Sequence, residues 1–135
     1  MAVDRDREAI VRAGDEWFYK DFHAASAHRV GRTVYISGEL GTGPDGGLPE
    51  DPKAQMRNAF ENLSDTLQAS GATWGDVVAM TTYHVGLQSQ IQTFVEIRNE
   101  FVREPYPAWT GVGVTELLDG AVVEIALVAE LPSDP

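Results

Sequence analysis

The stretch "DPKAQMRNAFENLSDTLQASG", residues 51–71, indicates most firmly how this chain folds. Asp51 suits a helix start because its side chain can accept an N–H bond, and Pro52 suits the first turn, where its missing N–H would be unpaired anyway. Apolar residues then recur at helical spacing: Met56, Ala59, Phe60, Leu63 and Leu67. With Gly71 as a C-terminal cap, the stretch predicts one long amphipathic helix.

Downstream of this helix, the pattern alternates between strands and a second helix. The β-branched run "GDVVAMTTYHV" predicts a strand, and Ser89 opens a helix whose apolar face comprises Ile91, Phe94, Val95 and Phe101 or Val102. Pro105 and Pro107 end that helix. The last two strands are predicted at "WTGVGV" and "AVVEIALVAEL", with the turn "TELLDG" between them.

Upstream, "HRVGRTVYISG" predicts a hairpin, with a Gly31-Arg32 turn and a second strand from Thr33 to Ser37. The first twenty residues could form a short helix or an extended arm. The order β-β-α-β-α-β is an α+β pattern, in which two helices cover one face of a mixed sheet. The other face also carries apolar residues, so we expect a homo-oligomer that packs these faces inward.

Length and composition limit the possible functions. We expect residues 1–135 to form one domain, with residues 1–23 as an N-terminal extension or arm. The net charge of -11 argues against nucleic acid and anionic membranes as partners. The absence of cysteine excludes disulfides and thiolate chemistry. Without an apolar signal or membrane segment, a cytoplasmic location is the default expectation.

Five motifs in order resemble the RidA-like proteins, also called the YjgF or L-PSP endoribonuclease family. They span roughly residues 24–131: "VYISGEL", "AQMRNAFENL", "GATWGDVVAMTTYHV", "YPAWTGVGV" and "VVEIALVAE". The resemblance implies a chorismate-mutase-like α+β fold of the bacillus type. It also implies a homotrimer with three equivalent small-molecule clefts between subunits.

The resemblance also implies roles for individual residues. In deaminating members, each cleft binds a small imine or enamine acid, from which water releases ammonia. Glu124 falls where a glutamate positions that water, and Ser37 and Gly38 fall where backbone groups help to hold the ligand. The arginine that grips the substrate carboxylate falls on Trp109. Because an indole offers one donor and a flat apolar face, the chain resembles an arginine-lacking subgroup, which argues against ordinary 2-imino acid deamination.

Each of these residues also has a structural interpretation. Trp109 could fill the core at a strand start or line the cleft, and Glu124 could face solvent or a neighbour's arginine. The hydroxyls of Thr110 and Ser37 could bind a ligand or serve only the fold. His23 lies beside the position of the family's tyrosine and can reach the cleft mouth.

The remaining polar residues indicate no metal or cofactor. The three histidines lack metal-ligand spacing, and "GTGPDGG" does not match a phosphate-binding loop, so we expect neither kind of site. We interpret one charged group as the solvated side of the second helix: Glu96, Arg98, Asn99 and Glu100. Arg98 or Arg32 could still supply the missing cation from another element.

Three functions are compatible with these patterns. The first is a deaminase-like hydrolase that acts on an imine, enamine or related unsaturated metabolite, with Glu124 as the base and Trp109 as an aromatic wall. The second is a binding or sensing trimer that uses the same clefts without turnover. The third is RNA cleavage, which the family name suggests and the net charge of -11 disfavours.

Overall fold

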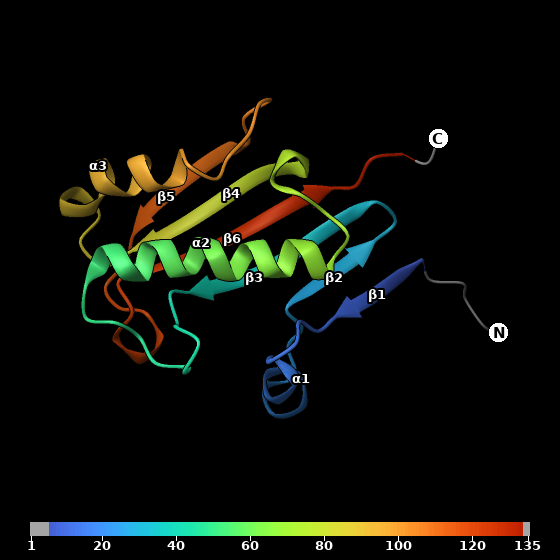
Figure 1. Cartoon of the computed structure of the whole chain (residues 1–135), viewed down its shortest axis with the longest axis horizontal. Coiled ribbons are helices and arrows are strands. Elements are labelled where there is room, and N and C mark those ends of the chain that lie inside the picture. Colours follow the sequence, from blue (N-terminus) through green and yellow to red (C-terminus); the bar gives the residue numbers. More distant parts are fainter. Residues whose placement is uncertain (1–5, 134–135) are drawn as a thin grey trace.

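Six strands form one mixed sheet in the computed structural model, which describes residues 6–133 (Figure 1). The strand order is β1-β2-β3-β6-β4-β5, and of the pairs only β4 and β5 run parallel in this described part. The strands are β1 (Arg7–Ile10), β2 (Ala27–Val30), β3 (Thr33–Leu40), β4 (Val77–His84), β5 (Ala108–Gly113) and β6 (Val123–Glu130). The sheet with its helices confirms the predicted α+β class.

Helices α2 (Pro52–Ala69) and α3 (Leu87–Arg98) cover one face of the sheet (Figure 1). As predicted, Asp51 caps α2: its Oδ1 accepts a hydrogen bond of 3.2 Å from the Lys53 N–H. Gly71 has a φ of 76° just beyond the helix, a conformation that favours glycine. The largest buried side chains lie between this helix layer and the sheet: Met56, Phe60, Leu63, Leu67, Met80, Phe94 and Ile125.

Three predictions about α3 were wrong. The helix ends at Arg98, so Phe101 and Val102 lie beyond it and the two prolines do not end it. The helix begins at Leu87 rather than Ser89, because Gly86 adopts a φ of 86° and turns the chain one residue before the first helical position. Its buried side is formed by Gln90, Phe94, Ile97 and Arg98, whereas Ile91 and Val95 are only half-buried. Arg98 therefore does not belong to the solvated side of the helix.

The β2–β3 hairpin has the predicted two-residue turn, with Val30 paired to Thr33. Strand β3 continues past the predicted end at Ser37, and its pairing with β6 shifts between Ile36 and Glu39. Beyond this bulge, Glu39 lies opposite the buried Ile125, and Leu40 lies opposite Glu124. The irregularity thus places Glu39 on the face that the helices cover.

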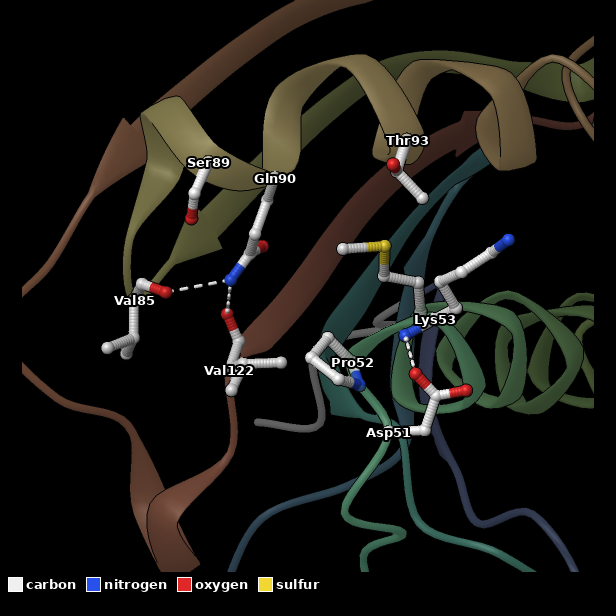
Figure 2. A pocket seen from close by; sticks show the side chains of 9 residues that line it. Asp51, Pro52, Lys53, Val85, Ser89, Gln90, Thr93 and Val122 are labelled. Atoms are coloured by element: carbon white, nitrogen blue, oxygen red, sulfur yellow. Dashed lines mark hydrogen bonds between the residues drawn. The ribbon is translucent and has the colours of Figure 1, made fainter.

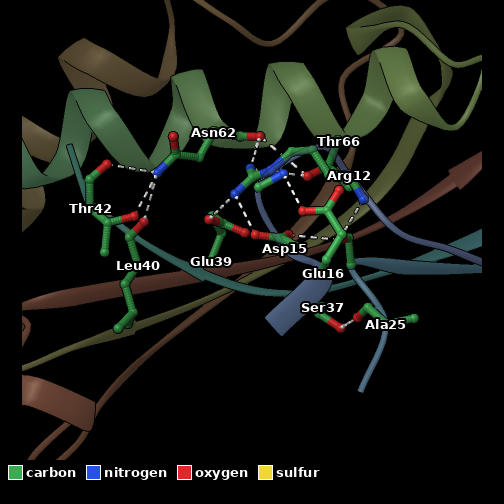
Figure 3. Close-up of polar contacts among 12 residues, drawn as sticks. Arg12, Asp15, Glu16, Ala25, Ser37, Glu39, Leu40, Thr42, Asn62 and Thr66 are labelled. Atoms are coloured by element: carbon green, nitrogen blue, oxygen red, sulfur yellow. Dashed lines mark hydrogen bonds and ion pairs between the residues drawn. The ribbon is translucent and has the colours of Figure 1, made fainter. Parts of the chain in front are cut away.

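The N-terminal segment contains both a strand and a helix, where the sequence indicated one or the other. Strand β1 extends the sheet by pairing with β2, and helix α1 (Glu16–Phe22) follows it. Arg12 joins this segment to α2 and β3, with Nη1 donating to the Asn62 carbonyl at 2.7 Å and Nη2 to Glu39 Oε1 at 3.2 Å (Figure 3). Burial outweighs this ion pair and raises the pKa of Glu39 to about 7.

The second face of the sheet has no helix over it in residues 6–133. On β6 the buried residues Val123 and Ile125 alternate with Glu124 and Ala126, which lie on this open face. Tyr35 on β3 is 54% exposed. That another molecule covers this face stays a prediction.

Candidate functional site

The carboxylate of Glu124 lies over Gly38 on the open face of the sheet. A Cβ atom at Gly38 would overlap with Oε2 of Glu124, so a glycine at this position leaves the space that the carboxylate fills. Tyr83 lies directly opposite Glu124 in the β4–β6 pairing, where facing side chains are neighbours. Glu124 is half-buried, and this burial raises the pKa of its carboxyl group above the ordinary value.

Ser37 connects Gly38 to the segment that follows α1. Its hydroxyl donates to the Ala25 carbonyl at 2.7 Å (Figure 3). Its N–H donates to the Ser26 carbonyl at 3.0 Å. His23 ends α1 with a φ of 57° and is exposed two residues before Ala25. The structure therefore places Ser37, Gly38 and Glu124 together, with the His23 segment bonded beside them.

Trp109 lies on the opposite face from Glu124. It pairs with the buried Met80 across β4 and β5, and so it shares the face that α3 covers. Its indole Nε1 donates to Thr82 Oγ1 at 3.0 Å, and its ring lies 6.0 Å from that of Phe94. Gly111 permits this seating, because a Cβ there would lie 3.3 Å from Thr82 Oγ1 and 3.4 Å from the indole. Thr110 faces the other way, toward Thr81 on the open face.

A chain of hydrogen bonds continues from Trp109 into the core. The Gln90 amide donates to the carbonyls of Val85 and Val122, so its oxygen is the group that faces His84 Nδ1 at 2.9 Å. His84 must then donate from Nδ1 and, when neutral, accept at Nε2 from the Thr82 hydroxyl at 2.7 Å. Burial lowers the pKa of His84, which keeps the ring neutral at pH 7.

The two arginines considered as alternative cations lie in different places. Arg32, in the hairpin turn, donates from Nε to the Leu131 carbonyl at 2.9 Å, at the end of β3 away from Gly38. Arg98, at the end of α3, is buried with its guanidinium carbon 4.8 Å from the centre of the Trp109 ring. A cation therefore lies beside Trp109, although it comes from a helix and not from the strand.

Sequence reasoning overlooked three parts of this arrangement. It did not select Tyr83 or Thr82, and it took Arg98 for a solvent-facing residue. The period-two alternation of β4 could have revealed that Thr82 and His84 share one face and that Tyr83 lies on the other. The helical period could likewise have revealed that Arg98, four residues after Phe94, shares the buried side of α3.

A separate pocket of about 270 Å³ lies between the start of α2 and α3 (Figure 2). Gln90 reaches across it to Val85 and Val122, and Asp51 bonds to the backbone of Lys53 (Figure 2). Its polar groups mainly hold chain segments together, and neither Glu124 nor Trp109 lines it. We assign it no role in the site.

Two further observations concern residues 6–133. No three His, Asp or Glu side chains in this range gather closely enough to hold a metal ion. None of its helices combines the length and the apolar character needed to cross a bilayer.

Comparison with known proteins places these features in a family. The family model described as Endoribonuclease L-PSP matches residues 20–131. A RutC family protein YjgH from Escherichia coli is 37% identical over 128 residues, which are 94% of this chain and 97% of that protein. A 2-iminobutanoate/2-iminopropanoate deaminase from Dermatophagoides farinae is 33% identical over 110 residues, covering 75% of this chain and 80% of the deaminase.

Solved structures give the same result for the fold. A structure of YjgH superposes with a TM-score of 0.84 at 36% identity and covers 96% of this chain and 99% of that one. A RidA structure from an Antarctic Psychrobacter gives a TM-score of 0.76 at 38% identity, with 79% and 87% covered. These proteins have the chorismate-mutase-like fold, so the predicted fold is confirmed.

Proposed function

This chain belongs to the Endoribonuclease L-PSP family, also known as the RidA or YjgF family, and on that premise we propose that it hydrolyses a small imine or enamine and releases ammonia. The observation that carries the proposal is the half-buried Glu124 carboxylate, seated over Gly38 on an open sheet face. A carboxylate with a raised pKa in a partly dry site is suited to accept and return a proton near neutral pH.

The chemistry requires one base and one water. Glu124 takes a proton from water as the oxygen bonds to the carbon of the C=N group. The same carboxyl group then returns that proton to nitrogen, which gives a carbinolamine. In a second transfer the carboxylate moves the hydroxyl proton of this intermediate to nitrogen, the C–N bond breaks as the C=O bond forms, and a carbonyl compound and ammonia leave. An enamine reaches the same step once its carbon is protonated. No redox partner is needed, because water supplies the oxygen and both products keep the oxidation level.

The names of relatives support this class of reaction. The similar proteins from Dermatophagoides farinae and from mouse are named 2-iminobutanoate/2-iminopropanoate deaminases. Trp109 separates this chain from the arginine-bearing pattern, since its single N–H is already donated to Thr82. A substrate with a carboxylate therefore needs its cation from a side chain other than residue 109.

We also propose that the complete site lies between copies of the chain in a homotrimer. Glu124 and Trp109 lie on opposite faces of one sheet, so one chain cannot bring both to a single small ligand. β5 is an edge strand, and the face that carries Glu124 is open in residues 6–133. Contact between the β5 edge of one copy and the open face of the next would bring the two parts together.

The test is ammonia release from a panel of freshly generated imines and enamines. Glu124→Gln keeps the size of the side chain and removes the base, so we expect the rate to fall about 100-fold or more. Glu130→Gln is the matched control, because Glu130 lies on the same strand and accepts a hydrogen bond from Thr33 at its far end. Equal rates for wild type and Glu124→Gln would remove Glu124 from the mechanism.

Ligand binding without turnover is the second candidate. Two polar groups of the predicted site, the Ser37 hydroxyl and the Trp109 N–H, already donate hydrogen bonds within the chain. They are therefore not free to assist a reaction, which favours binding alone. A compound that raises the melting temperature and is recovered unchanged would support this role.

RNA cleavage, to which the family description refers, fits this chain less well. The net charge of -11 repels a phosphate backbone. Degradation of RNA by rigorously purified protein, abolished in Glu124→Gln, would establish it instead.

A further inference from the structure

Arg98 occupies an unusual environment for a charged residue. It ends α3 and is only 9% exposed, and its guanidinium lies over the indole of Trp109 at 4.8 Å from the ring centre. The indole face attracts the cation but offers its N–H groups no lone pair to bond to. Burial lowers the pKa of the guanidinium.

The described part of the chain supplies no anion to this cation. The ion pairs found within residues 6–133 involve Arg12, Arg29, Arg32 and Arg57, but not Arg98. Within the same residues, the Arg98 guanidinium donates one hydrogen bond, from Nη1 to Asn99 Oδ1 at 3.3 Å. Its buried Nε has no partner there. The chain has 21 acidic residues, so this lack does not reflect a shortage of carboxylates.

We propose that Arg98 binds the carboxylate of a small organic acid at the β5 edge of the sheet. The Nε–H and the neighbouring Nη2–H point in one direction and match the two oxygens of a planar carboxylate. Trp109 holds the guanidinium plane from below, which limits the conformations available to a long side chain. An anion at this position would satisfy Nε and neutralise a buried charge.

The inference also assigns a role to Trp109. Trp109, on strand β5, supports a guanidinium group, and helix α3 supplies that group as Arg98. That the acid is an imine substrate or its keto acid product rests on the proposed function. The requirement for a carboxylate at Arg98 rests only on the burial and bonding of this residue.

The experiment follows the Arg98 Nε–H resonance in ¹⁵N-labelled wild-type protein during titration with 2-oxobutanoate. The neutral 2-oxobutanamide is the matched control ligand. We expect the acid to shift this resonance saturably and the amide to leave it in place. An unmoved resonance, or equal responses to acid and amide, would overturn the proposal. Because this measurement uses the unaltered protein, it does not depend on a variant that folds.

Variants provide a second readout. Arg98→Met keeps a long flexible stem over the indole and removes the charge, so affinity for 2-oxobutanoate should fall about tenfold or more, while that for the amide stays unchanged. Arg98→Lys should retain part of the preference for the acid. If Arg98→Met instead weakens self-association and leaves acid binding unchanged, the anion is a carboxylate of a second copy and the proposal is wrong.

The outcome is separable from that of the proposed function. Acid binding that depends on Arg98 in a protein that releases no ammonia would refute the deaminase proposal alone. Ammonia release that depends on Glu124 but is indifferent to Arg98→Met would refute the present inference alone.

Discussion

At Thr82, one hydroxyl joins two side chains that come from different strands. Thr82 is fully buried, and its oxygen accepts from the Trp109 indole at 3.0 Å while it donates to His84 Nε2 at 2.7 Å. The hydroxyl therefore holds the indole at a fixed angle beneath Arg98. A buried chain of this kind is costly to interrupt, since each group left unpaired loses its hydration without compensation.

Thr82→Val should reveal that cost. The substitution keeps the shape of the side chain but leaves the Trp109 N–H and His84 Nε2 without partners, so the free energy of unfolding at pH 7 should fall by about 2–4 kcal/mol. Thr81→Val is the control, because Thr81 is half-buried on the other face of the sheet. Within residues 6–133, the Thr81 hydroxyl forms no hydrogen bond to another residue. Urea denaturation of both variants measures the difference, and equal stabilities would contradict the assigned chain.

Gly38→Ala tests the seat of Glu124. The added methyl group would overlap with the carboxylate, so Glu124 must swing away, and ammonia release should fall about tenfold or more because the base is displaced. Gly75→Ala is the control, since the nearest atom to a Cβ there is Thr73 Oγ1 at 3.5 Å. If Gly38→Ala retains full activity on a substrate that wild type converts, the position of Glu124 over Gly38 has no catalytic meaning.

The roles of some single residues could be predicted from the sequence, and those of others were missed. The resemblance selected Glu124 and Gly38, and the structure shows that the two are in contact. Arg98 was misinterpreted, although it lies four residues after Phe94 and so shares the face by which α3 packs on the sheet. Neighbouring charges at Glu96 and Glu100 suggested a solvated helix side, although residues two positions apart point in different directions on a helix.

At the scale of elements, the join between the N-terminal segment and the sheet depends on a buried ion pair. Glu39 and Arg12 are both 15% exposed at their side chains, and Arg12 also contacts Asp15 and α2 (Figure 3). Burial raises the pKa of Glu39 to about 7, despite the nearby cation. The folded protein thus holds this proton more tightly than the unfolded chain does.

The sign of the pH effect follows from that difference. Below the unfolded pKa of 4.5 both states are protonated at Glu39, and between 4.5 and about 7 only the unfolded state loses the proton. The contribution of Glu39 to stability therefore falls as the pH rises through this window and is constant above it. Glu39→Gln should gain roughly 2–4 kcal/mol relative to wild type between pH 4.5 and 7.5.

Chemical denaturation across that pH range measures this gain. Glu61→Gln, on the exposed side of α2, is the control and should follow the wild-type profile. A Glu39→Gln profile parallel to that of wild type would show that Glu39 is ionised throughout the range.

Elements with strong local signals were predictable from the sequence. Asp51, Pro52 and the apolar period fixed α2, and the two-residue turn fixed the β2–β3 hairpin. The bulge after Ile36 was not predictable, because it depends on how β3 meets β6. The first twenty residues were ambiguous because β1 becomes a strand through its pairing with β2.

At the scale of the whole molecule, two observations favour assembly. One sheet face is open in residues 6–133, and Glu124 and Trp109 lie on opposite faces of the sheet. Tyr35 and Val78, on two strands of this sheet, are 54% and 48% exposed. A trimer of the 14.7 kDa chain is the state we expect by sedimentation at micromolar concentration. A monomer would contradict the proposal that the site forms between copies.

Complementation between two impaired variants, assayed well below saturating substrate, tests the central claim most directly. Glu124→Gln and Arg98→Met are refolded together in equal amounts, so that mixed trimers form. If a cleft takes Glu124 from one copy and Arg98 from its neighbour, about a quarter of the clefts in a random mixture carry both native residues and recover activity. We predict ammonia release at about that fraction of the wild-type rate, whereas a mixture no more active than its two components would contradict a site shared between copies.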